Sequence, residues 1–419
     1  MTPKNRINEF RSKCNKALTE QARLSGWSNE RVSWLRKQID EHTKMCHSLR
    51  KAVIFGQHQK TARLQSRIVG SFASRLCGKL YESKYGKYSH KPLLPTPWNE
   101  FERQVNRVPL VKTTADACHV YAVFKKNGEV RWLNSPGPRT RQAQRVLANI
   151  LYARLPQNFS EFNSKGKGRE AAVAEIIRQI EDKGISTFIV FDFKNFFSSV
   201  RPEHLQWLNL PKHVLDTVFF NKHVVQITQK GLLLKTETAR QGLPQGAIVS
   251  GQIASALLRR ELRCIGGALG KVTYVDDGVI GASSPVQAHK IAKALKARFA
   301  NLKGGPISFK KMEVRRLSTG FEFLGYWIQG NPCEDGVSLE IIPGLRAKKK
   351  FIAKLFKKFH QYRGGLDYDR AVEVFEGYFE MWKRSFRHWK PSSEQLNYTK
   401  FELEFCISDY SGLKKGGFT

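Results

Sequence analysis

The sequence predicts an α+β protein in which helical segments near both ends flank a strand-rich middle. Apolar residues recur at helical spacing in 32–53 and again from 345 onward. Between them, 119–133 contains two β-rich runs of the kind that pair as a hairpin. Two short apolar runs that end in Asp192 and Asp276 are typical of buried strands. Helices and strands are therefore both predicted in this chain, and we expect the α+β class.

Residues 1 to about 105 form the first predicted segment, which is basic and helical. Within it, 59–76 has helical spacing, with apolar side chains four residues apart on one face: Leu64, Ile68, Phe72 and Leu76. Arg63 and Arg67 lie on the other faces, where they are either candidate nucleic-acid contacts or ordinary solvated surface. The proline-rich stretch 91–98 marks a boundary after these helices.

A hairpin and two helices are predicted next. The hairpin at 119–133 has Asn127-Gly128 between its two runs, a dipeptide that suits a type I′ turn. An amphipathic helix is predicted for 140–155. The following stretch, 161–184, begins as a basic, glycine-containing loop and continues as a second amphipathic helix.

The central strands follow. The run that ends at Asp192 is short, continuous and apolar, which indicates a buried strand. Residues 240–250 are a glycine and proline loop, and Ser250 is predicted to cap the helix after it. Residues 271–281 are predicted to form a strand, a tight turn and a second strand, and 321–330 to form one further strand.

The charge balance points to polyanionic partners. The chain has 71 Lys and Arg against 36 Asp and Glu, a net charge of +35, spread along its length and interleaved with aromatic residues. This distribution favours a long nucleic-acid track over a membrane-anchoring patch. The seven cysteines form no CxxC pair, so a zinc ribbon or finger has no support. With no membrane-length apolar run and no signal peptide, we expect an intracellular protein of a bacterial cytoplasm or an organelle, neither secreted nor membrane-bound.

Three carboxylates stand at the ends of the central strands: Asp192, Asp276 and Asp277. If these strands pair in one sheet, the carboxylates meet at its edge and repel one another unless cations compensate them. Oxygen ligands without nearby His or Cys favour Mg²⁺ or Mn²⁺ over zinc, and two such ions about 4 Å apart support nucleotidyl transfer. The alternative is that Asp192 is a turn residue or a helix cap and that Asp276-Asp277-Gly278 is simply a turn. The spacing by itself leaves both interpretations open.

Four motifs in order make the comparison specific: FDFKNFF, QGLPQGAIVS, YVDDG and FEFLGYWI. Together they resemble the palm of a reverse transcriptase, most of all the bacterial and organellar enzymes of group II introns and retrons. The resemblance covers roughly 45–330 and more loosely the helical region after 345. It implies a right-hand polymerase with a basic helical N-terminal extension (1–105), fingers and antiparallel-sheet palm (106–335), and a helical thumb with a C-terminal tail (336–419).

The resemblance implies roles for the acidic residues. Asp192 and Asp276 would be the principal ligands of two Mg²⁺ ions, with Mn²⁺ as the alternative, and the carbonyl of Phe193 would lie beside them. Asp277 would support the same catalytic metal site.

The resemblance also implies a nucleotide site. Phe197 would be a bulky gate that excludes the 2′-hydroxyl of ribonucleotides, or else would only pack beside Phe196. Gln245 and Gly246 would lie against the templating base and the incoming nucleotide, where glycine allows close backbone approach.

Cations are expected at two further positions. Arg131, with Lys125 or Lys126, would bind the triphosphate on the fingers hairpin. Lys311 would protonate the leaving pyrophosphate, although Lys310 is equally within reach.

Contacts with the primer and template complete the implied site. Tyr274 would lie near the primer end, or would only pack on the sheet as strand aromatics do. The helix at about 348–360 would follow the phosphates of an A-form hybrid with its lysines: Lys350, Lys354, Lys357 and Lys358.

The chain departs from the family pattern at three places. Ser250-Gly251 replaces the usual Ser-Pro, Gly278 stands where a bulky apolar residue is common, and Met312 replaces a threonine. The implied function is RNA-directed DNA synthesis with an RNA template, a DNA or RNA primer and dNTPs. A maturase-like protein that binds a cognate intron or other structured RNA is the alternative, and an RNA-dependent RNA polymerase is disfavoured by GLPQG and Phe197.

Overall fold

The computed structural model describes residues 3–87, 90, 92–111, 116–124, 130–155, 162, 167–221, 225–228, 242–333, 336–361 and 367–408. The chain packs as two units. The first unit contains Met1–Phe159, Phe193–Cys264 and Leu295–Ser308, and the second contains Ser160–Asp192, Ile265–Ala294 and Phe309–Thr419. Segments of the two units alternate along the chain, so each unit is assembled from segments that are distant in sequence.

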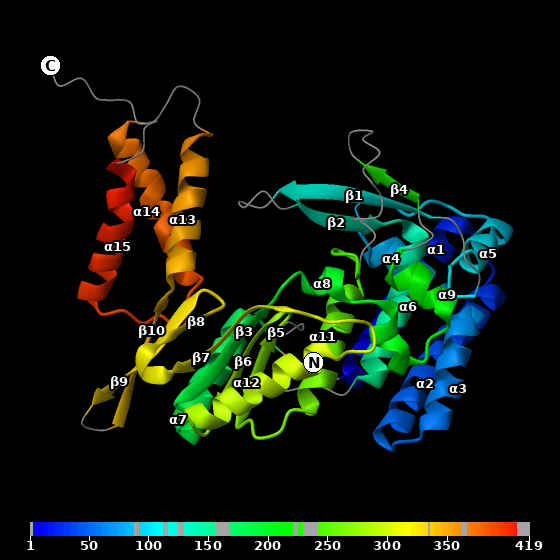
Figure 1. The fold of residues 1–419 in the computed structure, drawn as a ribbon. Coiled ribbons are helices and arrows are strands. Elements are labelled where there is room, and N and C mark those ends of the chain that lie inside the picture. Colours follow the sequence, from blue (N-terminus) through cyan, green and yellow to red (C-terminus); the bar gives the residue numbers. More distant parts are fainter. Residues whose placement is uncertain are drawn as a thin grey trace. The chain divides into compact units, whose positions relative to one another are not determined.

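The N-terminal helices of the first unit are α1 (Pro3–Ser25), α2 (Asn29–Ile54), α3 (His58–Gly70), α4 (Phe72–Tyr85) and α5 (Trp98–Asn106). They pack with α6 (Pro138–Arg154), the helix predicted for 140–155 (Figure 1). The single helix expected at 59–76 is wrong, because the chain breaks at Ser71. Ser71 has an extended ψ of 144°, and its hydroxyl accepts a hydrogen bond from the Ser74 N–H at 3.1 Å, which starts a new helix.

A buried ion cluster joins two of these helices. The Glu82 carboxylate on α4 accepts from Arg141 Nε at 2.5 Å and from Arg145 Nε at 2.9 Å, both on α6. The side chains of Glu82 and Arg141 are only 3% and 9% exposed. Glu82 and Arg141 are therefore a buried ion pair, to which the partly exposed Arg145 adds a second positive charge, and removal of Glu82 would leave a buried charge without its partner.

The predicted hairpin is present in the first unit. β1 (Ala117–Phe124) and β2 (Val130–Pro136) pair antiparallel from Phe124 opposite Val130 to Cys118 opposite Pro136. A short strand, β4 (Val225–Thr228), adds to β1 in parallel. The proposed turn at Asn127-Gly128 and the candidate Lys125 lie outside the described residues.

The rest of the first unit is a series of short helices and one longer helix. They are α8 (Phe196–Ser199), η1 (Pro202–Leu208), α9 (Lys212–Val214), η2 (Leu215–Phe219) and α11 (Ser250–Arg263). The prediction that Ser250 caps α11 is wrong, because Val249 occupies the cap position. The Ser250 hydroxyl instead donates to the Pro244 carbonyl at 2.8 Å and fixes the preceding loop.

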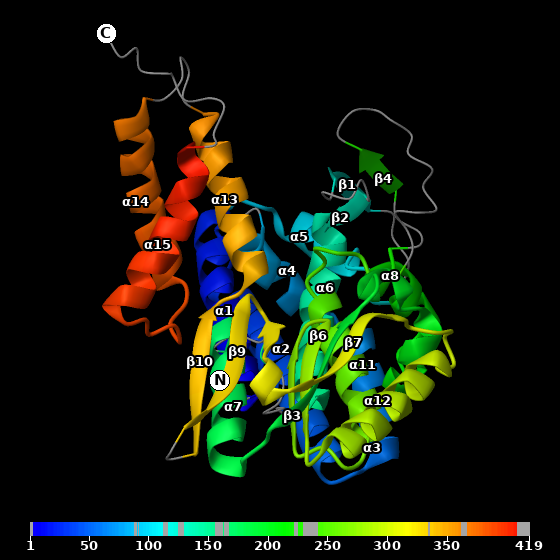
Figure 2. The same cartoon turned by 60° about the vertical axis from the view of Figure 1, so that its left-hand side comes forward.

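A four-stranded sheet forms the centre of the second unit, in the order β5-β6-β3-β7. The strands are β3 (Thr187–Phe193), β5 (Gly270–Tyr274), β6 (Asp277–Ala282) and β7 (Phe309–Arg316). β6 pairs antiparallel with both β3 and β5. The helix α7 (Arg169–Lys183) contributes Ile176 to a core that also holds Val190 and Val272 of this sheet, and α12 (Pro285–Ala300) follows β6 (Figure 2).

A second sheet follows, in the order β10-β9-β8. The single strand expected at 321–330 is wrong, since the segment folds back as β8 (Phe321–Phe323) and β9 (Tyr326–Cys333). Leu324 and Gly325 form the two-residue turn with φ of 50° and 86°, the left-handed conformations of a type I′ hairpin. β10 (Gly336–Pro343) then pairs with β9, and η3 (Leu317–Thr319) precedes β8.

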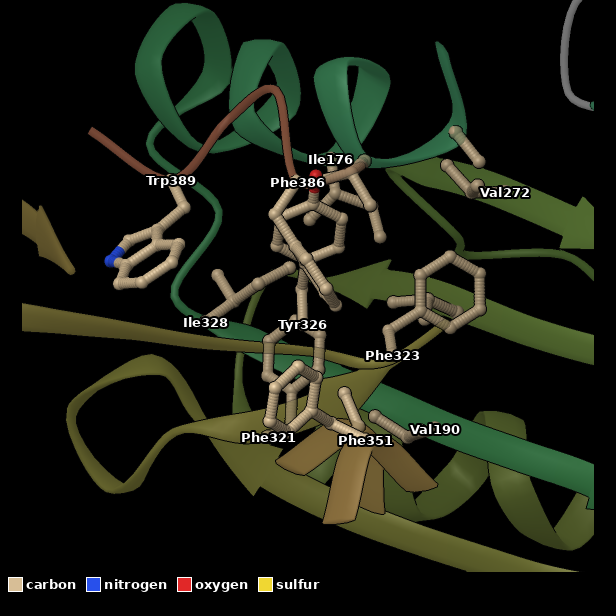
Figure 3. Close-up of a cluster of buried hydrophobic side chains, with 14 of the residues drawn as sticks. Ile176, Val190, Val272, Phe321, Phe323, Tyr326, Ile328, Phe351, Phe386 and Trp389 are labelled. Carbon is tan, nitrogen blue, oxygen red and sulfur yellow. The ribbon is translucent and has the colours of Figure 1, made fainter. Parts of the chain in front are cut away.

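Three helices end the second unit: α13 (Leu345–Phe359), α14 (Tyr368–Arg384) and α15 (Ser393–Ser408). They contact one another and lie side by side in Figures 1 and 2. Buried aromatic residues of these helices and of the segment between α14 and α15 join the same core as both sheets of this unit. Figure 3 shows that Phe351, Phe386 and Trp389 meet Phe321, Tyr326 and Ile328 there.

The structure confirms a mixed α+β fold with helices and antiparallel sheets. The division at about 105 and 335 stays a prediction, and the two packing units cut across it. Among the described residues, no helix is long and apolar enough to cross a membrane. Six described cysteines are free thiols, four of them buried: Cys14, Cys46, Cys77 and Cys118.

Candidate active site

The register of the central sheet brings the acidic residues together. Asp192 at the end of β3 lies directly opposite Asp277 at the start of β6. Tyr274 at the end of β5 is the other neighbour of Asp277, so Val275 and Asp276 form a two-residue turn. Residues directly opposite in an antiparallel pair have Cβ atoms about 5 Å apart. Asp192, Asp276 and Asp277 therefore share one end of the sheet, and the strand pairing that the sequence had left open is present.

The turn between β5 and β6 has an unusual backbone. Val275 has a φ of 59°, a left-handed conformation that β-branched residues rarely adopt. Such conformations cost about 1–3 kcal/mol and persist only where the surrounding structure imposes them. Here the pairing of β5 with β6 on either side imposes it. The result is a tight hairpin that holds Asp276 at its tip beside Asp277.

Burial and the neighbouring carboxylates change the pKa of Asp277. Burial, followed by the charges of Asp192 and Asp276, raises the pKa of Asp277 to about 7, against the opposing influence of Arg346 and Lys310. A carboxyl with such a pKa is poised to lose its proton when a cation arrives. The three side chains thus form one coupled acidic cluster.

The donor chemistry of this cluster fits a divalent cation. Three carboxylates supply only oxygen ligands, and their mutual repulsion favours a hard cation such as Mg²⁺. Among the described residues, no group of three or more His, Cys, Asp or Glu side chains is already arranged to hold a metal ion. In the cluster, Asp192 Oδ2 lies 3.3 Å from Lys310 Nζ. The three carboxylates thus lie at one end of the sheet, and one of them, Asp192, forms an ion pair with Lys310.

A cavity of about 460 Å³ in the second unit opens onto the acidic cluster. Asp192, Asp277 and Tyr274 line it on the sheet side. Its cationic wall comprises Arg169, Lys311, Arg346, Lys350 and Lys354. Its aromatic wall includes Phe351, Tyr378, Trp382 and Phe386. The carboxylates of Asp192, Asp277 and Glu322 therefore line a pocket whose other charged residues are cations and whose remaining wall is largely aromatic.

The two neighbouring lysines of β7 have different partners. Lys310 reaches Asp192, and its side chain is 64% exposed. Lys311, the residue favoured from the sequence, contacts Glu313 Oε2 at 3.2 Å and lines the cavity. Side chains alternate along a strand, so the two lysines point to opposite faces. Both are near the acidic cluster, and they are not interchangeable.

Two of the four predicted lysines of α13 line the cavity and two do not. Lys350 and Lys354 line the cavity. Lys358 Nζ lies 4.8 Å from the centre of the Tyr378 ring, and Lys357 is exposed. Arg346, four residues before Lys350, lines the same wall and was missed from the sequence. Its helical spacing from Lys350 and Lys354 could have identified it.

Gly278 is explained by its neighbour on β3. Phe191 lies directly opposite Gly278, and a Cβ atom built on Gly278 would be 2.2 Å from Phe191 Cζ. Phe191 is 1% exposed, and its ring meets Phe309 edge-on at 5.8 Å. The phenyl ring therefore fills the space that a bulky side chain at 278 would otherwise occupy. It packs next to the pair Asp192–Asp277 in the register.

The first unit brings two predicted nucleotide-site residues together. Arg131 Nε on β2 donates to Gln245 Oε1, and the Asn134 N–H donates to the Gln245 carbonyl at 2.6 Å. Gly246 has a φ of 101°, and a Cβ atom there would lie 2.6 Å from the Asn134 carbonyl oxygen. Only glycine fits this approach. The loop at 242–249 is thus attached to the hairpin.

Phe197 lies in the same unit as that loop. Its side chain is half-buried, and its carbonyl accepts from the Leu243 N–H at 2.7 Å. Phe193 is buried, with its ring 4.8 Å from both Phe196 and Phe299. Core packing therefore accounts for Phe193 and Phe196, whereas Phe197 is left partly accessible.

The arginines of α3 are surface residues. Arg67 Nη2 lies 3.0 Å from Glu41 Oε1, and its side chain is 65% exposed. Arg63 is also exposed. Neither has a described neighbour that marks a binding site, so their nucleic-acid role stays a prediction.

Residues 123–328 match the family profile described as reverse transcriptase (RNA-dependent DNA polymerase). No curated protein matches the chain in sequence. Among solved structures, telomerase from Candida albicans in complex with a TWJ fragment of telomeric RNA aligns at 14% identity and a TM-score of 0.36, covering 80% of this chain and 64% of that one. Apo telomerase from Candida tropicalis, truncated from its C-terminal domain, aligns at 13% identity and a TM-score of 0.37, covering 55% of each chain.

This chain thus spans less than two thirds of the telomerase chains. The profile match begins in β1, ends in β9 and includes all three aspartates of the acidic cluster. Residues 123–328 of this chain are therefore a reverse transcriptase domain, a nucleotidyltransferase domain of the RNA-directed DNA polymerase class.

Proposed function

We propose that the protein extends a DNA or RNA primer on an RNA template with dNTPs, as a reverse transcriptase of the group II intron and retron type. The observation that carries the proposal is the register of Asp192 opposite Asp277, with Asp276 in the adjoining turn. A cationic and aromatic cavity adjoins these carboxylates. An acidic cluster in such a pocket suits phosphoryl chemistry on a polyanion.

Two Mg²⁺ ions, or Mn²⁺ ions, would be held by Asp192, Asp276 and Asp277 with the carbonyl of Phe193. When bound, such ions lower the pKa of the attacking hydroxyl and stabilise charge on the leaving pyrophosphate. The protein itself contributes the burial that raises the pKa of Asp277 to about 7, so that cation binding near neutral pH would displace a proton from part of the population. Lys310 Nζ lies 3.3 Å from Asp192 Oδ2, where it offsets the negative charge of the free site.

The remaining groups would orient the substrates. Arg346, Lys350 and Lys354 would bind backbone phosphates without reading the base sequence. Lys311, which lines the same cavity, would donate a proton to the pyrophosphate. In right-hand terms the β1–β2 hairpin belongs to the fingers, the four-stranded sheet to the palm and α13–α15 to the thumb.

The nucleotide would be selected by groups of the first unit. Arg131, held by Gln245, would bind the triphosphate with its planar guanidinium. Phe197, half-buried, would exclude the 2′-hydroxyl by steric conflict.

A primer-extension assay tests the proposal. Purified protein with an RNA template, a DNA primer and Mg²⁺ should extend the primer with dNTPs and not with rNTPs. Asp276→Ala should lower the extension rate by at least about a thousandfold, because it removes a ligand of the charge-stabilising ions. Extension by rNTPs alone would show that the substrate assignment is wrong. Phe197→Ala should admit ribonucleotides, and if it does not, the gate assignment fails.

A maturase-like role in binding structured RNA is the second candidate, and one surface favours it. An open groove of about 950 Å³ runs over α1, α2 and α4. Its charged residues are mostly cations, namely Arg11, Lys16, Arg23, Arg36 and Lys84 against Glu20 and Asp40. This groove would therefore suit the backbone phosphates of an RNA. Tight binding of intron RNA without any primer extension would favour this function over polymerisation.

A further inference from the structure

A polar cluster in the second unit connects α7, β9 and the segment between α14 and α15. At its centre is Tyr326 of β9, which is fully buried. The Tyr326 hydroxyl donates to Glu170 Oε2, in the first turn of α7, at 2.6 Å. A hydrogen bond from a buried hydroxyl to a carboxylate is about twice as strong as one between neutral groups. The proposed chemistry uses neither residue.

Glu170 also holds the segment that follows α14. Its Oε2 accepts from the Arg387 N–H at 3.2 Å, and its main-chain carbonyl accepts from His388 Nε2 at 2.9 Å. Because Nε2 donates to a carbonyl, that ring nitrogen carries a proton. One residue of α7 therefore fixes two consecutive residues of the segment 385–389.

Arg169 adds a third set of contacts to the same segment. Its guanidinium donates to the Ser385 carbonyl and lies 2.7 Å from Glu170 Oε1. The guanidinium carbon is 4.6 Å from the ring centre of Phe386 and 5.2 Å from that of Tyr326. These are cation–π distances, and Phe386 and Tyr326 meet edge-on at 5.0 Å. The segment is thus held by polar contacts on one side and by aromatic rings on the other.

A continuous series of ring contacts leads from this cluster to the basic wall of the cavity. Phe386 lies 5.0 Å from Trp382 of α14, and Trp382 lies 5.0 Å from Phe351 of α13, centre to centre. Figure 3 shows Tyr326, Phe386 and Phe351 in one cluster of buried side chains. Phe351 is the neighbour of Lys350, which lines the cavity together with Asp192. The position of the α13 lysines therefore depends on the contacts of Tyr326.

We propose that Arg169, Glu170 and Tyr326 form a clamp that positions α13 and thereby sets how long the enzyme retains its primer–template. The inference rests on the proposed polymerase function. These are positioning residues, since they act through α14 and α13. Weakening the clamp lets the lysine wall move away from the duplex, which accelerates dissociation of nucleic acid. The acidic cluster, on a separate sheet edge, keeps its register, so the chemical step is preserved.

Tyr326→Phe tests the clamp, because it removes one hydroxyl and keeps the ring. Processivity is measured as nucleotides added per binding event with heparin as trap, and the rate of the chemical step by single-nucleotide incorporation from a pre-formed complex. Tyr326→Phe should lower processivity about tenfold and leave the incorporation rate within about twofold. Glu170→Gln, which leaves one side-chain oxygen where two now accept, should act in the same direction. Tyr398→Phe, at a 68% exposed tyrosine, is the matched control and should change neither quantity.

Two outcomes would overturn the clamp: unchanged processivity in Tyr326→Phe, or an equal loss of processivity and incorporation rate. Hydrogen exchange of residues 345–359 supplies a readout that needs no catalysis, and it should speed up in Tyr326→Phe and not in Tyr398→Phe. If the unsubstituted protein extends no primer, the proposed function fails. The clamp is then decided by this exchange and by the dissociation rate of a fluorescent primer–template.

Discussion

At the scale of single residues, the site depends on a few contacts around the aspartates. Asp277 has a raised pKa, because burial and the charges of Asp192 and Asp276 act on it in the same direction. The next residue, Gly278, has no side chain, and the Phe191 ring occupies the space where one would lie. Asp277 therefore has the unfavourable electrostatic environment, and the absence of a side chain at Gly278 makes the close packing of Phe191 possible.

Asp277→Asn should stabilise the metal-free protein at pH 8. Folding raises the pKa of Asp277 from 3.8 to about 7, so the folded state binds its proton more tightly and loses stability as the pH rises through that range. Removing the carboxylate should raise the free energy of unfolding by about 2–4 kcal/mol at pH 8. Denaturant unfolding with a chelator present measures it.

The pH supplies the control for that prediction. Well below pH 3.8, the carboxyl is protonated in both states, and the difference between Asp277→Asn and the unsubstituted protein should vanish. Added Mg²⁺ should stabilise the unsubstituted protein more than the variant, since the variant lacks a ligand. A variant that is less stable at pH 8 would contradict the raised pKa.

Gly278→Ala should impair both stability and primer extension. The new methyl group would lie 2.2 Å from Phe191 Cζ, so either this buried ring or the strand pair must shift. Overpacking of this kind costs about 1–3 kcal/mol. It also displaces the strand pair that aligns Asp192 with Asp277. Thermal unfolding and the primer-extension rate measure the two effects.

Gly377→Ala is the matched control for Gly278→Ala. Gly377 lies within α14 with no atom near the added methyl group, so alanine should stabilise the helix by about 0.5–1 kcal/mol. An unimpaired Gly278→Ala protein would show that Phe191 is not locked in place.

At the scale of elements, hydrophobic periodicity found the helices and strands, and local backbone chemistry decided where they break. Residues 59–76 keep helical spacing across Ser71, yet the Ser71 hydroxyl caps a new helix there. Residues 321–330 have a strand-like composition, yet Leu324 and Gly325 turn the chain back on itself. Periodicity reports which face is apolar and does not report a two-residue turn or a cap within it.

The ion cluster between α4 and α6 joins two helices, and no sequence pattern predicted it. Glu82→Ala should lower the free energy of unfolding by about 3–5 kcal/mol, because it leaves the buried Arg141 and its neighbour Arg145 without their counter-charge. Urea unfolding monitored by circular dichroism measures the loss.

Glu41→Ala is the control for Glu82→Ala. It breaks the ion pair with Arg67, whose side chains are 65% and 41% exposed, and should cost no more than about 1 kcal/mol. Equal losses in the two variants would show that burial does not distinguish the two pairs.

At the scale of the whole molecule, sequence order and spatial grouping differ. The first unit combines the N-terminal helices with Phe193–Cys264, and the second combines the strands of the acidic cluster with α13–α15. A basic composition of 71 Lys and Arg against 36 Asp and Glu predicted a nucleic-acid partner without indicating which cations gather. Arg346, Lys350 and Lys354 gather at the cavity because helical spacing places them on one face of α13.

The sequence by itself predicted the α+β class, the hairpin at 119–133 and three aspartates as candidate site residues, because strand length, turn composition and motif order are read along the chain. The tertiary structure alone decided that Asp192 pairs with Asp277, that Phe191 accounts for Gly278, and that Lys310 reaches Asp192 while Lys311 faces the cavity. It alone joined Glu170 to Tyr326, 156 positions away. Such contacts depend on register and packing between distant segments, which one-dimensional spacing does not encode.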